Sequence, residues 1–322
     1  MPDAAKELSI HQEMGWTMER KPLRMGSVKE VYDLDRELEF RFTDRISVFD
    51  KVIPSLIPQK GETLCREGVH WFMRAKRMGI ATHFEKFLPP NGMLVKKVDV
   101  IEPERIGPES KNYLIPLEVI CRWYAAGSIY DRLAAGKVRP EELGFPRGRK
   151  VEYGERLPEP YIEVSTKLER IDRLLEKREA LEISGLSTDE YDTICETVLK
   201  IDEDIRREVE PRGLIHVDGK KEFAFDEERR IMIVDVFGTA DEDRFWDKAK
   251  YEDGEFLDLS KEFVRQHYRR TGYKDLLYGA RDRREAEPDI PPLPAEVIGE
   301  AREIYIRLFE MITGEKFESC GR

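Results

Sequence analysis

The sequence predicts an α+β protein of two domains, in which helices pack against antiparallel sheets. Strand-forming runs dominate the first third of the chain, whereas a later part carries one long amphipathic helix followed directly by two strand-forming runs. The 322 residues, 40% of them hydrophobic, are enough to form two ordinary cores. We therefore expect a β-rich domain over residues 1–115 and a larger α+β domain over residues 116–322.

In the first domain, residues 28–34, 38–42 and 93–101 carry β-branched and aromatic residues between turn signals, which predicts three strands. Gly26-Ser27 suits a two-residue hairpin turn before the first of them. Apolar residues over 64–78 recur at helical spacing, and Gly79 supplies a stop. We expect this helix to pack on the sheet.

Three prolines between residues 103 and 116 mark a loop, and they place the domain boundary near residue 115. Further along, Ser187 and Glu190 form a capping box ahead of a helical apolar pattern that reaches residue 209. Pro211 and Gly213 end that helix, and strands follow over 214–225 and 231–237.

Composition excludes several classes of protein. A net charge of -11 opposes binding to nucleic acid or to anionic membranes, and no long apolar run could span a bilayer. Charges within residues 1–20 argue against a signal peptide, so we expect a cytoplasmic protein. The four cysteines and five histidines show no metal-ligand spacing. The sequence leaves a homo-oligomer open.

The hairpin over 214–237 carries a candidate metal site. If Asp226 pairs with Ile231, antiparallel register places Glu222 opposite Asp235, and Lys220 lies on the same face as Glu222. Paired carboxylate oxygens suit Mg²⁺ bound to substrate phosphates. A structural salt bridge between Lys220 and one of the acids is an equal alternative, and a register slip of one residue would dissolve the pair.

A candidate phosphate site surrounds Arg122. Ala125, Ala126, Gly127 and Ser128 follow it, and then a helical stretch begins, so a guanidinium, a hydroxyl and helix N–H groups could converge on an anion. An ordinary serine N-cap, with Arg122 in a surface ion pair, is the alternative interpretation.

Other polar residues are candidates for nucleotide or substrate contacts: Lys29, Lys60, Lys96, Lys97, Asp44 and Ser47. The alternative interpretation is that the lysines are solvated on strand faces and that Asp44 and Ser47 belong to an ordinary strand-to-turn segment. The segment 165–167 is either a ligand loop or a helix N-terminus. Because the sequence contains neither a Walker loop nor GxGxxG, a P-loop or Rossmann site is disfavoured.

Taken in order, these segments resemble the motifs of the phosphoribosylaminoimidazole-succinocarboxamide synthase family, also called SAICAR synthetases. The matching segments are GSVKEVY (26–32), TDRISVFD (43–50), PQKG (58–61), PLEVICR (116–122), AGS (126–128), STK (165–167), VDGKKEF (217–223) and RFW (244–246). The resemblance spans roughly residues 20 to 270.

The resemblance implies a two-domain fold with an ATP-grasp-like nucleotide cleft. It also implies a reaction in which ATP activates the carboxylate of carboxyaminoimidazole ribonucleotide for attack by the amine of L-aspartate. The residues it implies are Lys29 and Lys97 at ATP, Glu222 and Asp235 at Mg²⁺, Arg122, Ser128, Asp44, Ser47 and Lys60 at substrate, and Lys220, Arg244 and Asp241 in catalysis.

Two departures from the family pattern stand out. The loop over 235–244 is one residue longer than the usual form, and Trp123 replaces an asparagine. The longer loop leaves open a related ATP-dependent ligase or phosphotransferase that uses another acid. A non-catalytic nucleotide-binding regulator is the alternative from another class, although the joint presence of Lys220, Glu222 and Asp235 argues against it.

Overall fold

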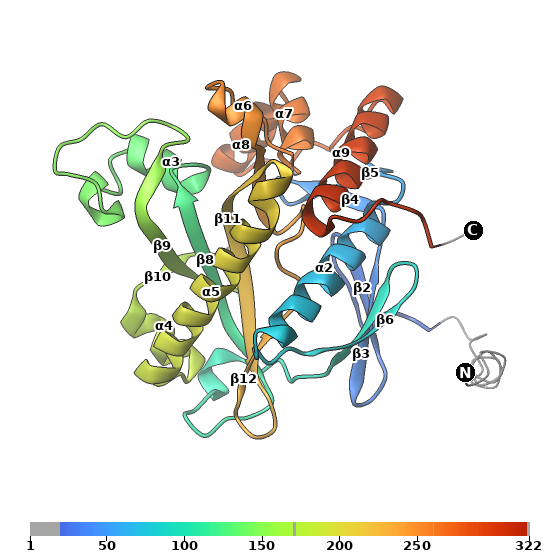
Figure 1. The fold of residues 1–322 in the computed structure, drawn as a ribbon, viewed down its shortest axis with the longest axis vertical. Helices are drawn as coiled ribbons and strands as arrows, with labels where there is room; N and C mark the ends of the chain where they lie inside the picture. The colour runs from blue at the N-terminus through green and yellow to red at the C-terminus, as the bar shows by residue number, and fades with distance from the viewer. Residues whose placement is uncertain (1–19, 170–171, 260, 321–322) are drawn as a thin grey trace.

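The computed structural model describes residues 20–169, 172–259 and 261–320, so the stretch tested above for a signal peptide lies outside it apart from Arg20. A first antiparallel sheet has the strand order β1-β2-β3-β7-β6 (Figure 1). Its strands are β1 (Arg24–Met25), β2 (Lys29–Asp33), β3 (Glu37–Phe42), β6 (Phe84–Leu88) and β7 (Gly92–Lys96).

A second antiparallel sheet has the order β10-β9-β8-β11-β12, and β13 also pairs with β11. Its strands are β8 (Leu114–Tyr124), β9 (Arg156–Thr166), β10 (Leu174–Leu175), β11 (Leu214–Phe225), β12 (Ile231–Val234) and β13 (Asp243–Asp247). A separate hairpin joins β4 (Arg45–Val48) to β5 (Lys51–Leu56). The predicted α+β class is confirmed.

Helices cover both sheets. They are α2 (Lys60–Arg77), α3 (Ser128–Ala134), α4 (Lys177–Ser184), α5 (Thr188–Val209), α6 (Lys248–Glu252), α7 (Glu262–Arg270), α8 (Tyr273–Arg283) and α9 (Ala295–Thr313). Helix α2 packs on β3 and β7, and α5 packs on β8 and β11. The C-terminal helix α9 packs against α2, so two helices far apart in the sequence lie side by side (Figure 1).

Local sequence signals placed most of these elements. The capping box is present, since the Glu190 N–H donates to Ser187 Oγ at 3.2 Å and the Ser187 N–H donates to the Glu190 carboxylate at 2.8 Å. The first turn differs by one position: Gly26 N–H donates to Lys29 O, so the loop residues are Ser27 and Val28. Strand β7 ends at Lys96, earlier than expected.

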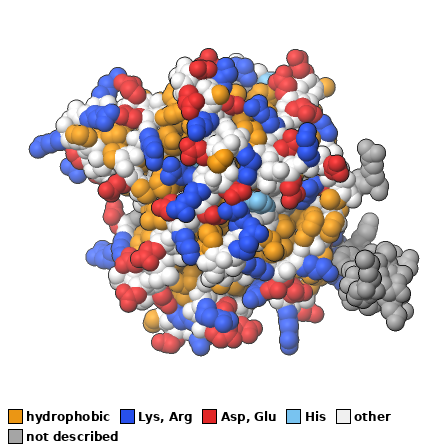
Figure 2. All heavy atoms as spheres, viewed as in Figure 1, with side chains coloured by type: hydrophobic (Ala, Val, Ile, Leu, Met, Phe, Trp, Pro, Cys, Tyr) orange, Lys and Arg blue, Asp and Glu red, His pale blue; other side chains and the backbone are white. Residues whose placement is uncertain are grey.

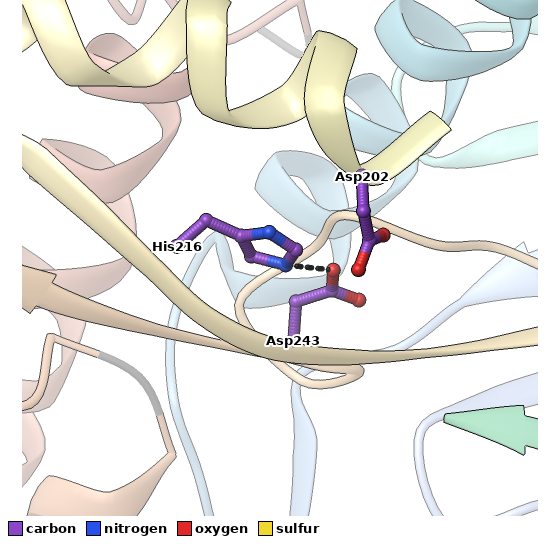
Figure 3. Close-up of side chains that lie close together, drawn as sticks. All are labelled: Asp202, His216 and Asp243. Carbon is purple, nitrogen blue, oxygen red and sulfur yellow. Dashed lines mark hydrogen bonds and ion pairs between the residues drawn. The ribbon is translucent and has the colours of Figure 1, made fainter. Parts of the chain in front are cut away.

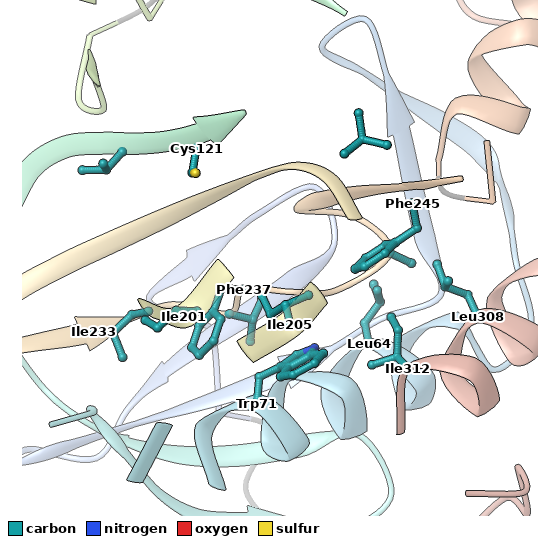
Figure 4. Packing of buried hydrophobic residues seen from close by; sticks show 14 of the residues in the cluster. Leu64, Trp71, Cys121, Ile201, Ile205, Ile233, Phe237, Phe245, Leu308 and Ile312 are labelled. Atoms are coloured by element: carbon teal, nitrogen blue, oxygen red, sulfur yellow. The ribbon is translucent and has the colours of Figure 1, made fainter. Parts of the chain in front are cut away.

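One hydrophobic cluster runs through both sheets. Figure 4 shows Trp71 of α2, Ile205 of α5 and Leu308 of α9 converging on Phe237 and Phe245. Each of these side chains is buried. Because burial of such side chains contributes roughly 1.5–3 kcal/mol each, this shared core fixes the two sheets relative to each other.

The sheets are also joined through the backbone. Ile233 of β12 accepts a hydrogen bond from the His83 N–H at 3.1 Å and donates to Ala81 O at 2.9 Å. Thr82 and Ile233 form a parallel bridge. The segment 81–83, which leads into β6 of the first sheet, therefore lies directly beside β12 of the second.

The predicted register of the β11–β12 hairpin is wrong by one residue. Phe225 pairs with Ile231, so Glu222 lies opposite Val234 and not opposite Asp235. The Asp226 N–H bonds to Arg230 O, which leaves a three-residue loop in which Arg229 has φ +59°. Three-residue hairpin loops commonly end in such a left-handed residue, and sequence alternation alone does not choose between loops of three and four.

Asp235 nevertheless reaches the side of the sheet that carries Glu222. Its φ is +55°, so β12 stops at Val234 and the chain turns instead of continuing the strand alternation. The Val236 N–H donates to Asp235 Oδ1 at 2.7 Å. An aspartate in the left-handed region can be stabilised by a local hydrogen bond of this kind. Here it ends the strand one residue before the pairing that the sequence predicted.

On the face shown in Figure 2, Lys and Arg side chains are interspersed with Asp and Glu. A surface of mixed sign matches the modest excess of 66 acidic over 55 basic residues. Within the residues described, no helix has the length and apolar character needed to cross a membrane.

We predict that Gly238→Ala destabilises the protein more than Gly136→Ala. Both glycines have φ +67°, and an alanine there costs about 1–2 kcal/mol. A Cβ at Gly136 meets open space, whereas one at Gly238 would lie 2.5 Å from Trp71 Nε1, which adds about 1–3 kcal/mol. Urea denaturation measures both free energies of unfolding, and equal losses would contradict the packing at Gly238.

Candidate active site

A cavity of about 650 Å³ lies along the junction of the two sheets, and we call it the inter-sheet cavity. Lys29 of β2, Lys97 after β7, Glu222 of β11 and Asp235 after β12 all line it. The four residues that the sequence assigned to nucleotide and metal therefore come together from both sheets.

Lysines neutralise the two carboxylates that the sequence assigned to this cavity, Glu222 and Asp235. Lys29 forms an ion pair with Asp235, and Lys167 lies 2.5 Å from the Glu222 carboxylate. Burial would raise the pKa of Asp235, but Lys29, Lys167 and Lys220 hold that pKa below its usual range. Asp235 is thus ionised, as a metal ligand must be.

Lys167 directly follows β9, so the helix interpretation of 165–167 is wrong.

The carboxylate opposite Glu222 belongs to β8. Glu222 pairs across the sheet with Glu118, and Lys220 Nζ lies 2.8 Å from Glu118, 3.3 Å from Glu222 and 3.3 Å from Glu242. Burial opposes the charge on Lys220, but these three carboxylates raise its pKa well above the ordinary value. Burial also raises the pKa of Glu118. Lys220 therefore remains an ammonium ion bound by glutamates.

A second cavity of about 270 Å³ opens at the end of β8 and β11, and we call it the sheet-end cavity. Five residues predicted from the sequence line it: Arg122, Ser128, Lys220, Asp241 and Arg244. The other lining residues, which were not predicted, include Glu242, Lys261 and Arg265. Glu242 lines both cavities, so they meet at this side chain.

Protein acceptors hold the Arg122 guanidinium in place. Nε and Nη2 donate to Glu163 Oε1 at 2.7 and 2.5 Å, and Nη1 donates to Asp218 Oδ2 at 2.8 Å. Nη2 also donates to Ser128 Oγ at 3.1 Å. The N-cap of α3 is Gly127 and not Ser128, so the serine hydroxyl stays in the cavity beside Arg122.

Arg244 completes this wall. Its Nη1 donates to Asp218 Oδ2 at 3.1 Å, and its Nε lies 3.4 Å from Asp258. A Cβ at position 127 would lie 2.6 Å from Arg244 Nη1, so only glycine lets the guanidinium approach α3. Arg122 and Arg244 thus share one carboxylate oxygen at the sheet-end cavity.

Asp241 is anchored from behind by Lys60 of α2 and Tyr305 of α9. Lys60 Nζ donates to Asp241 at 2.8 Å, and Tyr305 Oη donates to it at 2.6 Å. Burial opposes ionisation of Asp241, but Lys60 and Lys261 hold its pKa below the usual range. Burial lowers the pKa of Lys261, although Asp241 partly offsets this effect.

Three residues assigned to substrate lie outside the walls of both cavities. Lys60 is fully buried in its pair with Asp241. Asp44 accepts a hydrogen bond from the Gly61 N–H at 2.9 Å, at the start of α2. Ser47 accepts a long one, 3.4 Å, from Lys261 Nζ. The structure therefore gives these residues supporting contacts with the protein, and direct contact with substrate stays a prediction.

A buried cluster behind the sheet has a composition that could suggest a metal centre. Asp202, His216 and Asp243 place potential ligand atoms within 4.8 Å of one another (Figure 3). However, Lys221 Nζ pairs with Asp202 and lies 3.1 Å from Asp243, and His216 Nε2 lies 2.7 Å from Asp243. An ammonium ion already fills the position that a cation would take, so we infer a structural charge cluster.

Sequence reasoning missed several of these residues for identifiable reasons. Strand alternation places Asp218 on the face of Lys220 and Glu222, so this signal was available. Lys221 lies on the opposite face, where a charge in a buried strand needs partners. Glu118, Glu163 and Lys261 come from other elements, and only the strand pairing and packing bring them to the site.

The α+β fold joins a lysine- and carboxylate-lined cavity between its sheets to an arginine-lined cavity, an arrangement that suits an enzyme acting on phosphorylated ligands. Residues 22–278 match the family model described as SAICAR synthetase. The chain belongs to the SAICAR synthetase family, a family of ligases of purine biosynthesis.

Individual relatives agree with this assignment. The phosphoribosylaminoimidazole-succinocarboxamide synthase of Thermoplasma acidophilum is 53% identical over 300 residues, which cover 92% of this chain and 100% of the relative. That of Thermoplasma volcanium is 50% identical over 297 residues, with the same coverage.

Solved structures share the fold. A SAICAR synthase from Saccharomyces cerevisiae in complex with SAICAR has a TM-score of 0.72 at 24% identity, over 92% of this chain and 96% of that one. A SAICAR synthetase in complex with ADP has a TM-score of 0.66 at 26% identity, over 92% and 99% of the two chains.

We predict that Lys221→Met lowers the free energy of unfolding by about 3–5 kcal/mol, because Asp202 and Asp243 would remain buried without their ammonium partner. Lys137→Met, at an exposed position, should change it by less than about 0.5 kcal/mol. EDTA should leave the Tm of the wild type unchanged. A fall in Tm with EDTA that persists in Asp235→Asn, which lacks a ligand of the other candidate metal site, would instead indicate a metal at the cluster in Figure 3.

Proposed function

We propose that this chain uses ATP to join the amine of L-aspartate to the carboxylate of carboxyaminoimidazole ribonucleotide, giving SAICAR, ADP and phosphate in the cytoplasm. ATP binds in the inter-sheet cavity, and the ribotide binds in the sheet-end cavity. The observation that carries the proposal is that the two cavities meet at Glu242, which lies 3.3 Å from Lys220 of the sheet-end cavity, so a phosphoryl group and a carboxylate can come together there.

On the nucleotide side, Lys29 and Lys97 supply positive charge for the ATP phosphates. Glu222 and Asp235 supply carboxylate oxygens in the same cavity, a donor set that suits Mg²⁺. These two residues would hold the ion, which when bound neutralises charge on the phosphates. Lys167, already next to Glu222, adds a further cation to this wall.

On the ribotide side, Arg122, Ser128 and Arg244 form a wall of donors for the phosphate. Glu163 and Asp218 fix the Arg122 guanidinium before substrate arrives, so little ordering entropy is lost on binding. Lys220 lines the sheet-end cavity beside Glu242, where the cavities meet, and is positioned to neutralise the carboxylate that is activated. Catalysis then rests on positioning and charge stabilisation.

Product analysis tests this function directly. Purified protein is mixed with ATP, Mg²⁺, L-aspartate and carboxyaminoimidazole ribonucleotide, and we expect SAICAR and ADP in equal amounts. Product from another acid or amine alone would identify a related ligase or phosphotransferase. Binding of ATP without turnover of any acid would identify a regulator.

We predict that Glu222→Gln and Asp235→Asn each reduce turnover by roughly 100-fold, or about 3 kcal/mol, because each removes a charged oxygen donor for Mg²⁺. Stability should fall by about 1–3 kcal/mol, since Asp235→Asn removes the carboxylate paired with Lys29 and Glu222→Gln removes the nearer of the two carboxylates beside Lys167. Turnover is measured against Mg²⁺ concentration beside thermal melting, with the exposed Glu196→Gln as the control. Near-normal turnover at ordinary Mg²⁺ would refute the carboxylate site.

We predict opposite effects for one residue on each side of the junction. Lys97→Ala should raise the KM for ATP about fivefold and leave the KM for the ribotide unchanged, since a single charge-assisted contact contributes about 1 kcal/mol at a partly exposed site. Ser128→Ala should do the reverse, because its hydroxyl lies in the sheet-end cavity. If either change affected both constants equally, the assignment of the two cavities would be wrong.

A further inference from the structure

Three consecutive acidic residues, Asp241, Glu242 and Asp243, occupy the loop that is one residue longer than the usual family form. Their side chains are 4%, 22% and 0% exposed. The carboxylates of Asp241 and Asp243 bind protein partners, Lys60 and Lys221 among them. Glu242 alone of the three reaches both cavities.

The junction where Glu242 lies has an excess of negative charge. Glu118, Glu222 and Glu242 surround Lys220, and Lys167 is the second cation, at 3.7 Å from Glu118 and 2.5 Å from Glu222. Three carboxylates therefore face two ammonium groups. Such a position favours the binding of one more small cation. The amine substrate can be this cation, because it enters the reaction as an ammonium ion.

We infer that Glu242 is the general base that removes a proton from the ammonium group of L-aspartate at the junction of the two cavities. This inference rests on the proposed function. The ammonium carries three protons, and the product amide keeps one. Glu242 takes one proton as the nitrogen lone pair forms the C–N bond, and the other leaves with the phosphate as the carbon–oxygen bond to phosphate breaks.

The neighbouring groups are poorer candidates for this proton transfer. Lys220 is held as an ammonium ion by three carboxylates and cannot accept a proton. Glu118 accepts a hydrogen bond from Lys220 at 2.8 Å and lines neither cavity. Glu222 is paired with Lys167 and belongs to the proposed metal site. Among the described residues, Glu242 forms an ion pair with Lys220 at 3.3 Å and interacts electrostatically with Lys261, and its side chain is still 22% exposed, which leaves oxygen lone pairs to face the cavities.

The first test compares two substitutions with L-aspartate as the nucleophile. Glu242→Gln should lower kcat by roughly 100-fold or more, within the usual range for a general base, while the KM values for ATP and the ribotide change less than about twofold. Glu242→Asp keeps a base and should recover part of kcat. Glu227→Gln, in the exposed β11–β12 turn, should keep wild-type kinetics. Thermal melting confirms that the variants are folded.

The second test replaces aspartate with hydroxylamine, which is uncharged at pH 8 and needs no base. ADP formation with hydroxylamine should be nearly equal in the wild type and in Glu242→Gln. An equal loss with both nucleophiles would overturn the role as a base, as would a Glu242→Gln enzyme with more than about a third of normal kcat. If the wild type forms no SAICAR from L-aspartate, the proposed function itself is rejected. If the wild type is active and Glu242→Gln is equally active with L-aspartate, only the inference about Glu242 is rejected.

Discussion

The short pairing between residues 81–83 and β12 is the contact on which the site depends. It runs from the segment before β6 in the first sheet to Ile233 in the second, and it sets the two sheets edge to edge. Lys29 on one sheet can then pair with Asp235 on the other. Without this junction, the residues for nucleotide and for metal would lie on separate surfaces.

Charge balance is the second constraint. The site buries many ionised groups, and each would carry a large desolvation cost if left alone. The structure offsets this cost by placing each buried charge beside groups of opposite charge. Lys220 lies among glutamates, Arg122 lies between Glu163 and Asp218, and Asp241 lies between Lys60 and Lys261. Such pairing keeps the groups ionised and fixed in place, which suits a reaction that depends on charge already in position.

The loop over 235–243 links these networks to the core. The Trp71 indole N–H donates to Gly238 O at 2.8 Å, and the Gly238 N–H donates to Asp243 at 3.0 Å. Asp243 is bound in turn by Lys221 and His216 behind the sheet. Buried residues of the core thereby hold Asp241 and Glu242 at the cavities.

The sequence by itself determined the helices over 60–77 and 188–209, the long strands and the motifs that resemble SAICAR synthetases, because periodicity, capping and turn chemistry act over a few residues. It also selected Arg122, Ser128, Lys220, Arg244, Glu222 and Asp235, which the structure brings to two joined cavities. Only tertiary structure decided the register that pairs Glu222 with Val234 and Glu118, and the left-handed turn that returns Asp235 to the cavity. It likewise decided that Lys60 supports Asp241 and that Glu242 faces both cavities. These outcomes depend on loop closure and on contacts between distant segments, which no local pattern of residues specifies.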